Sequence, residues 1–189
     1  LHVKSQERPV NGSTDSPETL PEWQKPYQVT KLEPCLFDDF NSFTMPQVRM
    51  LARIVDEEGP ISVSLATKRL LKACGIQRAG SQIRATIRRA IRAGERLGGM
   101  VERDEFLWKP GRESLSVARI PVAGDPETFR TPDDIAAQEI AVAMTEICRT
   151  ALGISREALV SNVARVFGFG RTGSEVRTTI EEMIDQLVS

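Results

Sequence analysis

Apolar residues recur at helical spacing in several stretches of the chain. In residues 44–58 they fall on one face of a helix, at Val48, Leu51, Ile54 and Val55. Thr44 followed by Pro46 is a favourable helix start, and Gly59 with Pro60 is a favourable end. The same pattern predicts further helices over 63–73, 81–97 and 135–152, and others starting at Ser155 and Ser174.

Two short segments after the third predicted helix have strand character instead. Met100 to Arg103 and Phe106 to Trp108 flank a turn at Asp104 and Glu105, which predicts a β-hairpin, and residues 116–122 predict one more strand. Three helices and a hairpin follow one another in the order of a winged-helix unit. In that variant of the helix-turn-helix the third helix enters the DNA major groove.

The sequence around the third predicted helix occurs twice. GIQRAGSQIRATIRRAI begins at Gly75, and GFGRTGSEVRTTIEEMI begins 93 residues later, at Gly168. We therefore predict a mainly α protein with a small β-hairpin and two tandem winged-helix-like units. The first unit covers 43–113 and the second 131–189, with a linker at 114–130 and an N-terminal tail or linker at 1–42. The second unit lacks a hairpin because the sequence stops at Ser189, and the start at Leu1 suggests an excised piece of a longer protein.

The two copies differ on the face of the third helix that points away from the core. The predicted buried stripe of the first copy is Ile83, Ile87, Ala90, Ile91 and Gly94, and that of the second is Val176, Ile180, Met183, Ile184 and Leu187. The opposite face of the first copy carries Arg88, Arg89, Arg92 and Arg96. At the positions of Arg88, Arg89 and Arg92 the second copy has Glu181, Glu182 and Asp185.

Charge is unevenly distributed, although the net charge is only −1. Residues 43–113 contain 14 basic and 8 acidic residues, whereas residues 114–189 contain 7 and 11. Because such asymmetry is typical of a segment with an anionic partner, we expect the first unit to bind DNA. The candidate nucleic-acid-binding residues are Arg88, Arg89, Arg92 and Arg96, with Arg84 and Arg78 as weaker candidates.

Two other interpretations stay open. The basic helix could meet the acidic face of Glu181, Glu182 and Asp185, within one chain or across a homodimer, or it could simply be solvated. Arg84 and its counterpart Arg177 occupy the first helical turn, where the helix dipole disfavours a cation. We expect each to pair with a carboxylate, for Arg84 among Asp56, Glu57 and Glu58. The acidic hairpin tip, with Glu102, Asp104 and Glu105, argues against a wing that lies along phosphates.

Nothing in the sequence indicates catalysis. Cys35, Cys74 and Cys148 lie far apart and are expected to be buried thiols, and His2 is the single histidine, so no metal site or cofactor is expected. No apolar run is long enough to span a bilayer, and no secretory signal is present, so we expect a cytoplasmic protein that does not contact membranes.

Several phrases together resemble a known family. EEGPI, RAGSQIRATI, the hairpin ending FLW, and SREALVSNVARVFGFGRTGSEVR are similar to the C-terminal domain of unknown function of large bacterial superfamily 1 helicase-nuclease proteins. There the domain follows a nuclease module like that of very-short-patch repair endonucleases. The resemblance covers residues 27–189 and implies an accessory domain that works beside helicase and nuclease domains. The ATP-binding loop GxxxxGK followed by Ser or Thr is absent from this chain.

Overall fold

The protein is described by a computed structural model, which covers residues 20–34, 44–170 and 173–188. The helices are α1 (Met45–Glu58), α2 (Val63–Ala73), α3 (Ser81–Arg96), α4 (Ala137–Thr150), α5 (Arg156–Val166) and α6 (Ser174–Val188). The strands are β1 (Gln24–Pro26), β2 (Ile61–Ser62), β3 (Val101–Arg103), β4 (Phe106–Trp108) and β5 (Ala118–Ile120). Two short 3-10 helices, η1 (Pro126–Thr128) and η2 (Pro132–Asp134), precede α4. The prediction of a mainly helical protein with a hairpin is confirmed.

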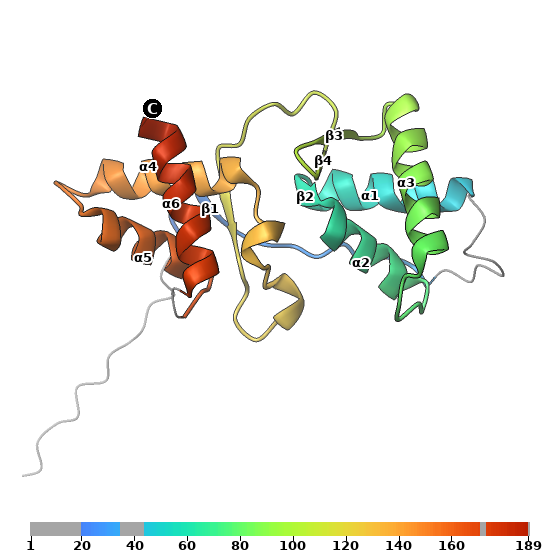
Figure 1. The fold of residues 1–189 in the computed structure, drawn as a ribbon, viewed down its shortest axis with the longest axis horizontal. Coiled ribbons are helices and arrows are strands. Elements are labelled where there is room, and N and C mark those ends of the chain that lie inside the picture. Colours follow the sequence, from blue (N-terminus) through green and yellow to red (C-terminus); the bar gives the residue numbers. More distant parts are fainter. Residues whose placement is uncertain (1–19, 35–43, 171–172, 189) are drawn as a thin grey trace, which may run out of the picture.

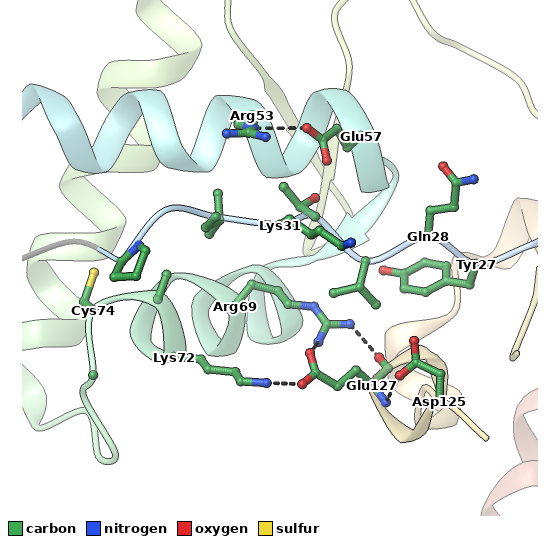
Figure 2. Close-up of a pocket in the computed structure, with 16 residues that line it drawn as sticks. Tyr27, Gln28, Lys31, Arg53, Glu57, Arg69, Lys72, Cys74, Asp125 and Glu127 are labelled. Carbon is green, nitrogen blue, oxygen red and sulfur yellow. Dashed lines mark hydrogen bonds and ion pairs between the residues drawn. The ribbon is translucent and has the colours of Figure 1, made fainter.

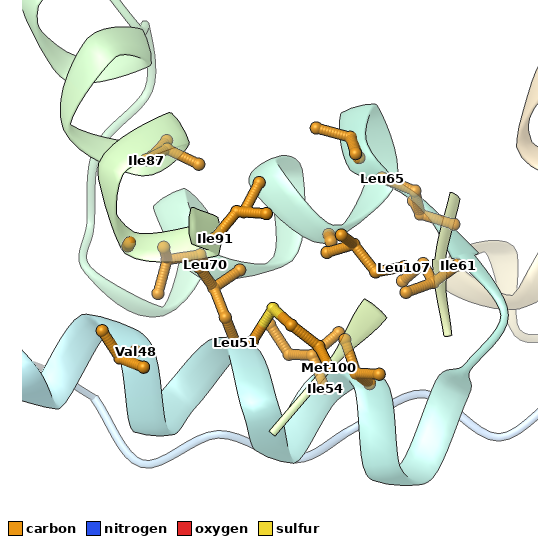
Figure 3. Close-up of a cluster of buried hydrophobic side chains, with 14 of the residues drawn as sticks. Val48, Leu51, Ile54, Ile61, Leu65, Leu70, Ile87, Ile91, Met100 and Leu107 are labelled. Carbon is orange, nitrogen blue, oxygen red and sulfur yellow. The ribbon is translucent and has the colours of Figure 1, made fainter. Parts of the chain in front are cut away.

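Helices α1, α2 and α3 enclose the first hydrophobic core (Figure 3), to which Met100 and Leu107 contribute from the hairpin region. The hairpin belongs to a three-stranded sheet of order β2-β4-β3, in which both pairings are antiparallel. Its two-residue turn places Asp104 and Glu105 at φ of 49° and 61°. Positive φ at both central residues matches the right-handed twist of the strands that the turn joins.

Helices α4, α5 and α6 enclose a second core, which also contains Ala118 of β5. The turns that precede α3 and α6 have the same construction. Gly75 and Gly168 have φ of 68° and 81°. In each turn the residue after the glycine donates its backbone N–H to the carbonyl oxygen five residues earlier. These hydrogen bonds run from Ile76 to Leu71 and from Phe169 to Ala164, and both are 2.9 Å long. The sequence repeat is therefore also a repeat of local structure.

The segment from Leu20 to Pro34 is part of the fold, which corrects its assignment to an N-terminal tail. Strand β1 pairs in parallel with β5, with Gln24 opposite Ala118, and Tyr27 is only 2% exposed. A three-residue strand and a single buried aromatic ring leave no periodic signal in the sequence, which explains the error. Residues 1–19 and 35–42 of the predicted tail lie outside the described residues.

Two smaller expectations also change. The helix predicted from residue 135 starts at Ala137, because Thr131 begins the separate 3-10 turn η2. Cys148 is exposed and Cys74 half-buried, so the expectation of buried thiols is wrong for Cys148, while Cys35 and the side chain of Leu187 lie outside the described part. No helix in the described segments is long and apolar enough to cross a membrane.

Candidate functional site

Helix α3 presents the candidate arginines because its other face is fixed in the first core. Ile87 and Ile91 are buried, and Gly94 lies against the side chain of Met100 so closely that a Cβ would be 2.5 Å from its terminal carbon. In Figure 1, α3 occupies the end of the molecule farthest from α4, α5 and α6. The arginine-bearing face is therefore not covered by the second unit.

Arg88 is held by the hairpin. Its Nη1 donates to Glu102 Oε1 at 2.6 Å and its Nη2 to Glu105 Oε2 at 3.0 Å. The hydrogen bond to Glu102 raises the pKa of the Arg88 guanidinium above its ordinary value. Glu95 adds a further link, since its carboxylate accepts from the backbone N–H of Glu102 at 3.0 Å. The acidic hairpin tip thus anchors the sheet to α3.

The side chains of the remaining candidate arginines are exposed to solvent and form no ion pair with a described residue. They are Arg84, Arg89, Arg92 and Arg96 on α3 and Arg78 in the preceding turn. Arg92 Nε lies 3.4 Å from the backbone oxygen of Arg88. The cationic face of α3 is hereafter the set Arg89, Arg92 and Arg96, the arginines of the outward face that form no ion pair with a described residue.

The carboxylate partner expected for Arg84 is not found. Glu57 pairs with Arg53 at 3.0 Å, Glu58 with Arg69 at 3.4 Å, and Asp56 with Lys109. The expectation holds only for the second copy, where Arg177 pairs at 3.1 Å with Glu181 of its own helix.

Two of the three acidic residues proposed as the complement of α3 have partners inside the second unit, whereas Glu182 forms no ion pair with a described residue. Asp185 pairs with Arg156 at 2.8 Å, and Glu181 pairs with Arg177. No ion pair joins α3 to α6 among the described residues. The complementary helices therefore do not neutralise each other within the chain.

A buried ionic cluster at the junction of the two units escaped the sequence analysis. Glu139 of α4 is fully buried between two arginines, and Arg130 Nη1 donates to it at 2.8 Å while Arg119 supplies further hydrogen bonds. Burial alone would raise the pKa of the Glu139 carboxyl, but the two guanidinium groups outweigh burial and lower it to about 2. The only signal in the sequence is a glutamate next to the apolar stripe of a helix.

Tyr27 connects this cluster to the first unit. The Arg130 guanidinium lies 4.5 Å and that of Arg119 5.1 Å from the centre of the Tyr27 ring, and the Tyr27 hydroxyl donates to Glu58 at 2.7 Å. Burial, followed by the proximity of Glu58, raises the pKa of Tyr27 well above its usual value. The N-terminal segment is thereby fixed between the two units.

A large open cavity of about 1270 Å³ lies along this segment, between α1 and α2 (Figure 2). The charged groups drawn there largely satisfy one another: Arg53 pairs with Glu57, and Arg69 and Lys72 both pair with Glu127. Its described lining contains no histidine. In the described part of the chain no three His, Cys, Asp or Glu residues gather as a metal site.

Residues 39–85 match the model of a family described as a protein of unknown function, DUF3320. The match covers α1, β2, α2 and the first residues of α3. The search of curated proteins and the search of solved structures each returned no match. The part of the chain that builds most of the first core and leads into the candidate arginines is therefore similar to a domain of unknown function.

Proposed function

We propose that the chain is a non-catalytic module that binds or positions nucleic acid, most simply duplex DNA, through the cationic face of α3. In this proposal residues 45–108 act as a winged-helix unit and α4, α5 and α6 as a related unit without a wing. The observation that carries the proposal is the set of exposed, unneutralised guanidinium groups on the outer face of α3. Arginines on one helical face can contact phosphates and guanine edges.

The order of elements supports this role for α3. The chain runs α1, β2, α2, α3, β3, β4, with β4 between its two partners in the sheet. A helix that follows a short turn after another helix is placed in this way in helix-turn-helix proteins, where it enters the major groove. The side chains of Ser81, Gln82 and Ala85 at the start of α3 are exposed and would face the bases.

The acidic hairpin is compatible with this proposal, because two of its carboxylates bind Arg88. Glu102 and Glu105 are used to attach the sheet to α3, so the hairpin is not required to contact phosphate. Arg88 consequently has a positioning role, which leaves DNA contact to Arg89, Arg92 and Arg96, with Arg84 and Arg78 at the margin.

The proposal also includes the kind of larger protein in which this module works. The resemblance of the sequence phrases to the C-terminal domain of bacterial helicase-nuclease proteins favours an accessory domain acting beside helicase and nuclease domains in the cytoplasm. The alternative of a dimerisation module through α3 and α6 has less support, since Glu181 and Asp185 already bind Arg177 and Arg156.

Salt-dependent binding tests the proposal. A fluorescent duplex of about 20 base pairs is titrated with wild type and with Arg89→Gln/Arg92→Gln/Arg96→Gln between about 50 and 200 mM salt. We expect wild-type affinity to fall with salt, and the triple variant to lose about 2 to 3 units of the slope of log affinity against log salt, since each phosphate contact contributes about 0.9.

The matched control is Arg149→Gln/Arg156→Gln/Arg165→Gln, which removes three exposed charges from α4 and α5. It should keep the wild-type slope. No binding by the wild type at the lowest salt, or equal loss in both triple variants, would contradict a nucleic-acid site on α3. Dimerisation lost only in the α3 variant would instead establish the alternative.

A further inference from the structure

The hairpin holds the middle arginine of a row on α3. Arg84, Arg88 and Arg92 follow one another at intervals of four residues, which places them above one another on the helix. Arg84 and Arg92 are exposed and form no ion pair with a described residue. In contrast, both Nη atoms of Arg88 donate to the hairpin, one to Glu102 at 2.6 Å and the other to Glu105 at 3.0 Å. The central cation of the row is therefore already in use.

This contact changes the sign of the charge that a phosphate meets. One guanidinium and two carboxylates together carry a net negative charge, and the side chain of Glu105 is 73% exposed. Like charges that are brought together across an interface weaken binding. A phosphate is therefore attracted by Arg92 but repelled at the position of Arg88.

Arg88 is still within reach of a ligand, because its side chain is 41% exposed. A guanidinium pairs with a phosphate in the same way as with a carboxylate. The hairpin does not depend on Arg88 alone for its place. Glu95 of α3 accepts from the backbone N–H of Glu102 at 3.0 Å, and Leu107 of β4 is buried in the first core. Neutralising the two carboxylates should therefore release Arg88 while the hairpin stays attached.

We propose that Glu102 and Glu105 form an autoinhibitory contact, which withholds Arg88 from nucleic-acid phosphate and so limits the affinity of the site. The wild type then binds through the cationic face of α3. Arg88 becomes a further phosphate contact when the two carboxylates lose their charge. This inference rests on the proposed function and adds the regulation of the same site.

Neutralisation of the two carboxylates tests the contact. The duplex titration described above is repeated with Glu102→Gln/Glu105→Gln and with Arg88→Gln/Glu102→Gln/Glu105→Gln. One phosphate contact contributes about 0.9 to the slope of log affinity against log salt, so the slope of the double variant should be steeper than that of the wild type by about this amount. Its affinity at about 0.1 M salt should rise by up to about eightfold. Addition of Arg88→Gln should remove the increase in slope.

The matched control is Asp104→Asn/Glu113→Gln, which removes two exposed carboxylates that do not pair with Arg88. It changes the net charge as much as Glu102→Gln/Glu105→Gln does, and its slope should stay close to that of the wild type. Circular dichroism shows whether each variant is folded. If Glu102 is needed for folding, Glu105→Gln alone replaces the double variant and should give a smaller gain in affinity that also requires Arg88.

The results separate this inference from the proposed function. If the wild type binds DNA and Glu102→Gln/Glu105→Gln has the same slope, the autoinhibitory contact is overturned and the function stands. A gain that persists after Arg88→Gln, or that the control reproduces, also overturns the contact alone. Binding by the double variant but not by the wild type supports the contact if Arg88→Gln abolishes it. No binding by either protein contradicts the function, and the contact with it.

Discussion

Glu139 shows how one side chain depends on two cations. It is completely buried, and the side chains of Arg130 and Arg119 beside it are only 4% and 13% exposed. In such a cluster each charge is tolerated because the others compensate its lost hydration. Removal of the carboxylate would leave two guanidinium groups buried beside each other and beside Tyr27.

Glu139→Gln should therefore lower the free energy of unfolding by about 3 to 5 kcal/mol near neutral pH. The folded-state pKa, lowered to about 2, lies below the ordinary value of 4.5, so the charged form stabilises the fold above that value. This stability is lost as the pH falls from about 4.5 towards 2, by an amount on the order of 3 kcal/mol. Chemical denaturation across this pH range measures the loss.

Glu146→Gln in the same helix provides the control, because its ion pair with Arg149 is partly exposed. Glu146→Gln should lower the free energy of unfolding by less than about 1 kcal/mol. If the acid-dependent loss persists unchanged in Glu139→Gln, the charge of Glu139 is not its source.

Among the elements, the two repeated turns allow a direct comparison. Gly75 and Gly168 share a left-handed backbone, but a Cβ at Gly75 would meet nothing within 4 Å. A Cβ at Gly168 would lie 2.6 Å from Pro121 Cγ and 3.2 Å from Phe129 Cε1. The same conformation is therefore open to solvent in one copy and packed against the linker in the other.

Gly75→Ala should destabilise the protein by about 1 kcal/mol, the cost of a side chain in the left-handed region. Gly168→Ala should lower the free energy of unfolding by about 1 to 3 kcal/mol more, because Pro121 and Phe129 must move. Thermal unfolding of the two variants measures the difference. Equal losses would show that the linker does not pack against the second turn.

Local patterns predicted most elements and few of the contacts between them. Helices such as α1 and α3, and the hairpin around Asp104, follow from apolar spacing and turn residues that lie close together in the sequence. Strands β1 and β2 were missed, because three and two residues carry no period and their partners lie far along the chain. The pairing of Arg88 with Glu102 and Glu105 depends on how the hairpin folds back, which composition does not reveal.

At the scale of the whole molecule, hydrogen bonds join the two units. Ser62 Oγ donates to Asp134 Oδ1 at 2.5 Å and also accepts from the backbone N–H of Leu65, at the start of α2. Thr131 and Lys68 contact the other carboxylate oxygen of Asp134. The counterpart of Ser62 in the repeat, Ser155, caps α5 but is exposed.

Ser62→Ala and Ser155→Ala separate the two roles of this serine. Ser155→Ala removes a helix cap and should cost about 1 kcal/mol. Ser62→Ala also removes the hydroxyl that donates to Oδ1 of the buried Asp134, which adds about 1 to 3 kcal/mol to the loss of stability. Calorimetry should show a single unfolding transition for Ser155→Ala. For Ser62→Ala it should show a larger loss of stability and a broader transition. Equal losses would mean that Asp134 contributes nothing to the junction.

The parallel pairing of β1 with β5 joins segments 94 residues apart, since Gln24 lies opposite Ala118. During synthesis the N-terminal strand leaves the ribosome long before its partner exists. The Tyr27 ring can form its contacts with the two guanidinium groups only after Arg119 and Arg130 have been synthesised. The contacts of β1 and Tyr27 with the segment between the two units must therefore form late, after residues 118–130 have been synthesised.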